Sequence, residues 1–114
     1  MHIAILILFP ISASADPAEI IDSGAVRQGD NWQIAVTLRH RDLGWNDFAD
    51  GWRVEAQDGT VVAVRDLLHP HVDEQPFTRS VSGVAFPEGA ESYHVRARTT
   101  KTGWGAQRLE FSLP

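Results

Sequence analysis

Residues 31–39 have the sequence NWQIAVTLR, in which large apolar side chains alternate with small or polar ones. Successive side chains of an extended chain point to opposite faces, so Trp32, Ile34, Val36 and Leu38 share one face. This alternation is typical of an antiparallel strand with one buried and one solvated face. The segment therefore predicts a β-sheet that covers an apolar core.

The same alternation recurs on both sides of this segment, and no window keeps the 3.6-residue spacing of an amphipathic helix. Turn signals separate the repeats, among them Asp58-Gly59, which predicts a type I′ hairpin turn. A change of parity between Val81 and Val84 predicts a bulge. We predict an all-β domain, a single seven-stranded antiparallel β-sandwich, with strands at residues 20–28, 31–39, 52–57, 60–67, 77–86, 92–99 and 108–113.

Two parts of the sequence resemble known families. The stretch YHVRAR at residues 93–98, with Gly103-Trp104-Gly105 after it, resembles the sixth strand and following loop of fibronectin type III domains. This resemblance implies an immunoglobulin-like or fibronectin type III-like sandwich and says nothing of activity. HPHVDEQPFTRS at residues 69–80, of the form HPHVxEQPFTRS, and the tryptophan-containing residues 44–52 are similar to a family of small exported bacterial proteins of uncharacterised function. That similarity implies no activity.

The first residues indicate export. An apolar run from Ile3 to Phe9 is followed by Ala13-Ser14-Ala15, the small-x-small pattern of a signal-peptidase site. The run is much shorter than the ~20 residues that a membrane-spanning helix needs. We therefore predict a signal peptide over residues 1–15, a sandwich domain over residues 16–114, no membrane span, and a periplasmic or secreted protein.

The amino-acid composition restricts the classes of function that this protein can have. A net charge of −5 disfavours nucleic acid and anionic membranes as partners. The absence of cysteine excludes disulfides and thiolate metal ligands. A metal would therefore need imidazole and carboxylate ligands, which suit zinc, copper(II) or nickel. The sequence contains no serine-hydrolase, zinc-protease or phosphate-loop motif. We therefore expect a binding protein and not an enzyme.

A candidate metal site follows from the His-Pro-His stretch. Pro70 forces an extended backbone, which places the side chains of His69 and His71 on one side, about 6.6 Å apart at ~3.3 Å per residue. We predict that these two histidines bind copper(II) or zinc, and that the shell is completed by one of three further residues: Asp73, Glu74 or His40. Two alternatives remain open: the stretch is a rigid connector with solvated histidines, and His40 is a hydrogen-bonded residue at the end of the core.

A second hypothesis concerns aromatic residues. In a sandwich, the loops after the second, fourth and sixth strands lie at one end, which gathers Trp45, Phe48 and Trp104. These residues could form a surface that recognises a carbohydrate, another small ligand or an envelope protein. Alternatively, Trp45 and Phe48 anchor their loop on the sandwich edge, and only Trp104 is exposed. His94 is expected on a solvated, mixed-charge face.

Overall fold

The computed structural model describes residues 4–5, 15–87 and 92–114. Most of the predicted signal peptide therefore lies outside the described residues. The described residues form no helix and eight strands, and within them no helix could cross a membrane. The strands are β1 (Glu19–Gln28), β2 (Asn31–Arg39), β3 (Ala49–Ala56), β4 (Val61–Asp66), β5 (Phe77–Val84), β6 (Ser92–Thr99), β7 (Gly103–Trp104) and β8 (Leu109–Ser112).

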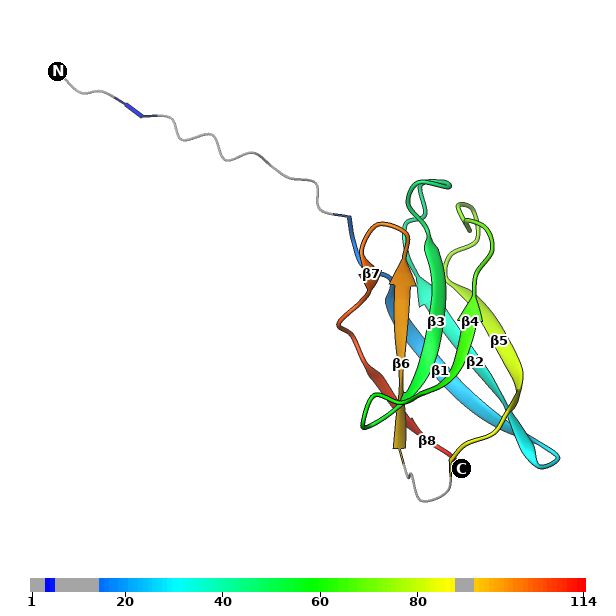
Figure 1. Cartoon of the computed structure of the whole chain (residues 1–114). Helices are drawn as coiled ribbons and strands as arrows, with labels where there is room; N and C mark the ends of the chain where they lie inside the picture. The colour runs from blue at the N-terminus through cyan, green and yellow to red at the C-terminus, as the bar shows by residue number, and fades with distance from the viewer. Residues whose placement is uncertain (1–3, 6–14, 88–91) are drawn as a thin grey trace.

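The strands form two antiparallel sheets that face each other (Figure 1). One sheet has the order β1-β2-β5. The other has the order β4-β3-β6, with β7 and β8 both paired to β6. The strands alternate in direction, so the loops after β2, β4 and β6 lie at the same end of the molecule (Figure 1). The predicted gathering of these loops is thus confirmed.

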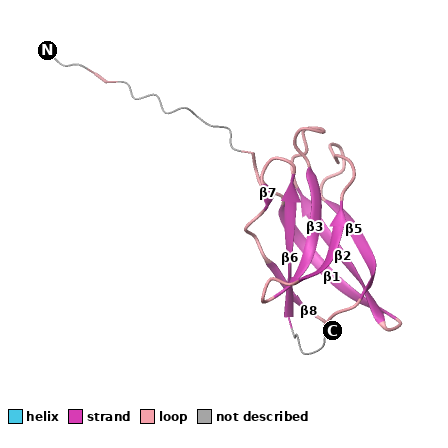
Figure 2. Cartoon of the chain, in the orientation of Figure 1, coloured by secondary structure: helices cyan, strands magenta, loops and turns pink. Residues whose placement is uncertain are grey.

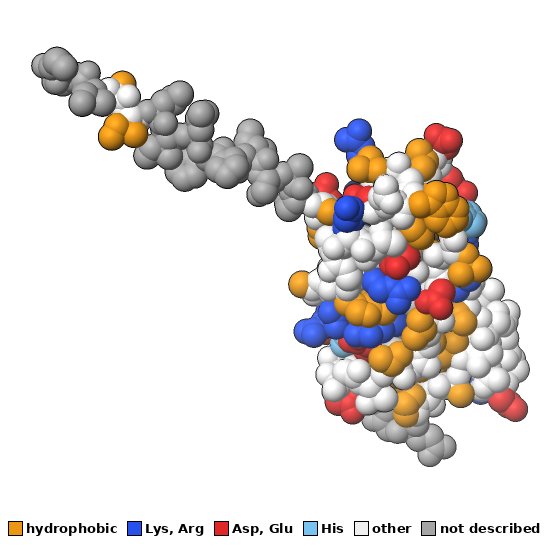
Figure 3. Space-filling view, turned by 45° about the horizontal axis from the view of Figure 1, so that its top comes forward, with side chains coloured by type: hydrophobic (Ala, Val, Ile, Leu, Met, Phe, Trp, Pro, Cys, Tyr) orange, Lys and Arg blue, Asp and Glu red, His pale blue; other side chains and the backbone are white. Residues whose placement is uncertain are grey.

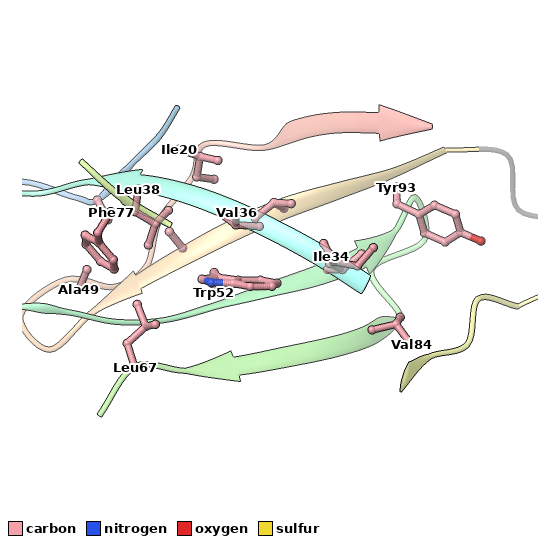
Figure 4. Close-up of a cluster of buried hydrophobic side chains, with 14 of the residues drawn as sticks. Ile20, Ile34, Val36, Leu38, Ala49, Trp52, Leu67, Phe77, Val84 and Tyr93 are labelled. Atoms are coloured by element: carbon pink, nitrogen blue, oxygen red, sulfur yellow. The ribbon is translucent and has the colours of Figure 1, made fainter. Parts of the chain in front are cut away.

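The apolar core lies between the sheets and is built from the alternation described above. Ile34, Val36 and Leu38 of β2 are fully buried, and they face Trp52 and the other inward side chains of the second sheet (Figure 4). Burying one large apolar side chain contributes about 1.5–3 kcal/mol. Without a disulfide, this core provides most of the stability. Its fully buried members from the second sheet also include Val54, Tyr93 and Val95.

Three details differ from or refine the prediction. The number of strands is eight, because Gly103–Trp104, predicted as a loop, pairs with Arg98 and Thr99 as β7. The turn after β3 is not type I′, because only Gly59 has a positive φ there, 90°, whereas type I′ needs two such residues. The register shift opposite Trp32 and Ile34 confirms the predicted bulge in β5, where Gly83 has φ 70°.

Candidate functional site

One buried carboxylate organises the end of the molecule where these loops meet. The Asp42 side chain has no exposed surface and accepts three hydrogen bonds. The donors are His40 Nδ1 at 2.6 Å, the backbone N–H of Ala49 at 2.9 Å and the backbone N–H of His71 at 2.8 Å. A buried carboxylate is tolerated when its oxygens are satisfied in this way. Asp42 therefore ties the β2–β3 loop, the start of β3 and the His-Pro-His stretch into one unit.

His40 belongs to this network and not to a free ligand set. Its Nε2 lies 2.9 Å from the backbone oxygen of Asp16, while its Nδ1 faces Asp42. Both ring nitrogens therefore lie within hydrogen-bond distance of an oxygen atom. The backbone N–H of His40 also donates to Gln75 Oε1 at 3.0 Å. The structure therefore matches the hydrogen-bonded alternative for His40, since neither ring nitrogen is left to bind a metal.

The histidines of the His-Pro-His stretch lie side by side, with ring centroids 4.7 Å apart. His71 is buried and stacks on Phe77 at 4.0 Å, whereas His69 is exposed. The Nε2 atom of His71 lies 3.0 Å from Nη2 of Arg79. Burial, followed by the positive charge of Arg79 and by His69, lowers the pKa of His71. Because a guanidinium can only donate, the neutral His71 ring accepts at Nε2 and carries its proton on Nδ1.

The predicted carboxylate ligands do not complete a metal shell. Asp73 and Glu74 are both exposed, and Glu74 lies 3.3 Å from Arg79 as an ion pair. In the part of the chain that the structure describes, no group of three or more His, Cys, Asp or Glu side chains is placed to hold a metal ion. Of the five predicted metal ligands, the structure brings only His69 and His71 together as neighbouring rings, beside a guanidinium.

The three aromatic residues do not form one surface. Phe48 is buried and meets the edge of Trp45 at 5.7 Å between ring centroids, while Trp45 itself is 70% exposed. Phe48 therefore anchors the loop, and Trp45 does not. The ring of Trp104 lies against the guanidinium groups of Arg53 and Arg98, at 4.0 and 5.0 Å from its centroid. Trp104 is half-buried on the outer face of the second sheet, which corrects the expectation of an exposed loop residue.

Four exposed apolar side chains lie at the same end, and all except Trp45 were missed by the sequence hypotheses. Leu43 and Trp45 lie on the β2–β3 loop, and Leu68 and Val72 lie on the β4–β5 loop, with exposed fractions of 56 to 77%. We call these four residues the loop-end patch. Figure 3 brings this end forward and shows apolar side chains at the surface among charged ones. The sequence did contain a signal for this patch: aliphatic residues occur in segments predicted as loops, and surface loops normally carry polar residues.

The outer face of the second sheet also needs a correction. His94, expected to be solvated, is buried and donates through Nε2 to Glu55 Oε1 at 2.7 Å. Burial alone would raise the pKa of Glu55, but the hydrogen bonds from His94 and Arg53 and the charges of Arg53 and Arg96 hold this pKa below its ordinary value. These polar side chains and Trp104 pack on one another, so their face is covered, and its charges are internally paired.

Comparison with known proteins gives one partial similarity. The chain is 39% identical over 77 residues to a protein of Halomicrobium mukohataei described as "Putative lipoprotein". The aligned part covers 68% of this chain and 37% of the relative, so the chain spans little more than a third of that protein. No protein-family model and no solved structure matches the chain.

Proposed function

We propose that this protein is an exported recognition module of the cell envelope that binds another envelope protein through the loop-end patch and catalyses no reaction. The similarity to a protein described as a lipoprotein and the signal-like first residues support the location. The observation that carries the proposal is the patch itself. Half of the large apolar side chains exposed on the described part of the domain lie on these two loops: four of Ile21, Val26, Leu43, Trp45, Val61, Val64, Leu68 and Val72.

The patch has the properties of a binding surface. Large apolar side chains that are gathered at one exposed end of a domain often mark a surface that a partner binds. Asp42 holds both loops through its hydrogen bonds to Ala49 and His71. Since these contacts fix the loops before any partner arrives, little conformational entropy is lost on binding. Trp45, the most protruding aromatic side chain, is the expected centre of the contact.

The composition of the patch favours a protein over a carbohydrate. Three of its four residues are aliphatic, whereas sugar recognition uses aromatic ring faces together with polar groups. A sugar would need a second aromatic ring face beside Trp45. The ring of Trp104 already lies against Arg53 and Arg98. Metal binding is supported by the 4.7 Å separation of the His69 and His71 rings, and opposed by the guanidinium of Arg79 on His71. We therefore place protein recognition first.

For the type of fold, we propose an immunoglobulin-like, fibronectin type III-like sandwich. The support is the arrangement of the seven main strands, with β1, β2 and β5 in one sheet and β4, β3, β6 and β8 in the other. Fold type by itself adds nothing to the functional argument.

Site-specific crosslinking in the native envelope tests the proposed function. A photoreactive amino acid replaces Trp45 in one variant and Val26 in the other. Val26 is exposed to a similar degree but lies on β1 near the opposite end. We expect one discrete crosslinked protein from position 45 and none from position 26. With that partner purified, Trp45→Ala should weaken binding about tenfold or more, as an interface hot spot does, while Val26→Ala should not. Equal crosslinking at both positions, or saturable binding of a polysaccharide that needs Trp45, would exclude the proposal.

A further inference from the structure

A small cavity lies between the end of β4 and the start of β5, with a volume of about 100 Å³. Its polar lining is mostly basic: Arg65 comes from β4, His69 and His71 come from the loop, and Arg79 comes from β5. Asp66 is the one acidic residue of the lining. Pockets for drug-sized molecules measure ~300–1,000 Å³, so this one suits a single small group.

Two hydrogen-bond donors in this lining have no acceptor. In the described residues, four buried side-chain polar atoms lack a partner, and two of them are Arg65 Nε and His71 Nδ1. His71 is 95% buried, with a relative exposure of 5%. Since its Nε2 accepts from Arg79, its Nδ1 carries the proton and is a true donor. Buried donors are almost always paired, so an acceptor between these two lining residues would satisfy both atoms.

The nearby carboxylates do not fill this role. Asp66 Oδ1 lies 3.2 Å from Arg98 Nη2, and the Asp66 side chain is 65% exposed. Glu74 Oε1 lies 3.3 Å from Nη1 of Arg79, and the Glu74 side chain is 59% exposed. Asp42 uses both oxygens for the hydrogen bonds described above. Arg65 Nε and His71 Nδ1 therefore remain without an acceptor, and the guanidinium groups disfavour a metal cation at this place.

We propose that this cavity is a binding site for a small oxyanion, either a carboxylate or a phosphate or sulfate group. Arg65 Nε and His71 Nδ1 donate to its oxygens, and the guanidinium groups of Arg65 and Arg79 supply the compensating charge. The stacking of His71 on Phe77 and the bond from its backbone N–H to Asp42 hold the imidazole in place without a ligand. This inference goes beyond the proposed protein recognition and does not depend on it.

Titration of the purified protein followed by ¹⁵N NMR tests the site. The probes are sodium phosphate, sodium sulfate and sodium acetate at constant ionic strength, with sodium chloride as the reference. The side-chain Nε–H signal of Arg65 and the Nδ1–H signal of His71 report on the two donors directly. We expect saturable shifts of both signals, and the anion that saturates at the lowest concentration identifies the preferred group. Arg65→Lys keeps the charge but loses the Nε donor, and should weaken binding about tenfold, as should His71→Phe, which keeps a flat ring on Phe77.

Arg108→Lys is the matched control, because Arg108 is exposed on a different edge and does not line the cavity. It should bind the anions as the parent does. Shifts that rise linearly with every salt, chloride included, or that are equally large at Arg108, would overturn the proposal. If crosslinking finds no partner at position 45 while the anions still bind, the anion site is supported and only the proposed protein recognition is wrong.

Discussion

Replacement of Asp42 by alanine should unfold the loop end and cost about 3–5 kcal/mol of stability. The substitution removes acceptors from the backbone N–H groups of Ala49 and His71 and from the ring of His40. Leaving one buried donor unpaired costs about 1–3 kcal/mol, and three donors lose their acceptor here. The total stays near the lower end of the sum, because the emptied site relaxes and admits water. The loss is a large fraction of the ~5–15 kcal/mol available to a small domain.

Urea denaturation of the parent, Asp42→Ala, Asp42→Asn and Asp73→Ala measures this effect. Asp42→Asn keeps the size and one acceptor oxygen, and should fall between parent and alanine. Asp73 is exposed on the neighbouring β4–β5 loop, so Asp73→Ala is the control and should stay within about 0.5 kcal/mol of the parent. Hydrogen exchange should also become faster at the His71 amide in Asp42→Ala. If Asp42→Ala loses less than about 1 kcal/mol and the His71 amide keeps its protection, then Asp42 does not organise the loops.

Three further predictions concern the core, the pH dependence and the metal hypothesis. Trp52→Ala empties a fully buried site and should cost about 3–5 kcal/mol in urea denaturation; a variant that melts within a few degrees of the parent would show that Trp52 contributes little. The pKa of His71 is lower in the folded than in the unfolded chain, so the unfolded chain binds this proton at a higher pH. The free energy of unfolding should therefore fall as the pH drops below about 6.5, the ordinary pKa of histidine, and should fall less in His71→Phe. In calorimetric titration with copper(II) and zinc, the parent and a His69→Ala/His71→Ala variant should behave alike, because Arg79 already occupies Nε2 of His71; uptake by the parent alone, with copper(II) the stronger, would establish the metal site.

The inward faces of the strands and the placement of the loops could be predicted from the alternation of apolar residues in the sequence. The inward positions of Ile34, Val36 and Leu38 could be predicted because side-chain direction in a strand depends only on parity, whatever the partner strand is. The gathering of the three loops could also be predicted, since it needs only the alternation of strand direction. Neither prediction requires knowledge of which side chains touch.

The site itself depended on contacts between distant residues. Asp42 meets His71 across 29 positions, and Glu55 meets His94 across 39. In the sequence, each of these residues is a polar side chain at a loop or on an outward face, and polarity there predicts solvation. A charged side chain is tolerated in the interior only when a specific partner satisfies its hydrogen bonds. The pairing of the strands and the packing of the loops determine which residue is that partner. The sequence by itself therefore determined the all-β class and the end at which the loops after β2, β4 and β6 meet. Only the tertiary structure decided which side chains lie beside the histidines: Asp42 beside His40, and Arg79 beside His71.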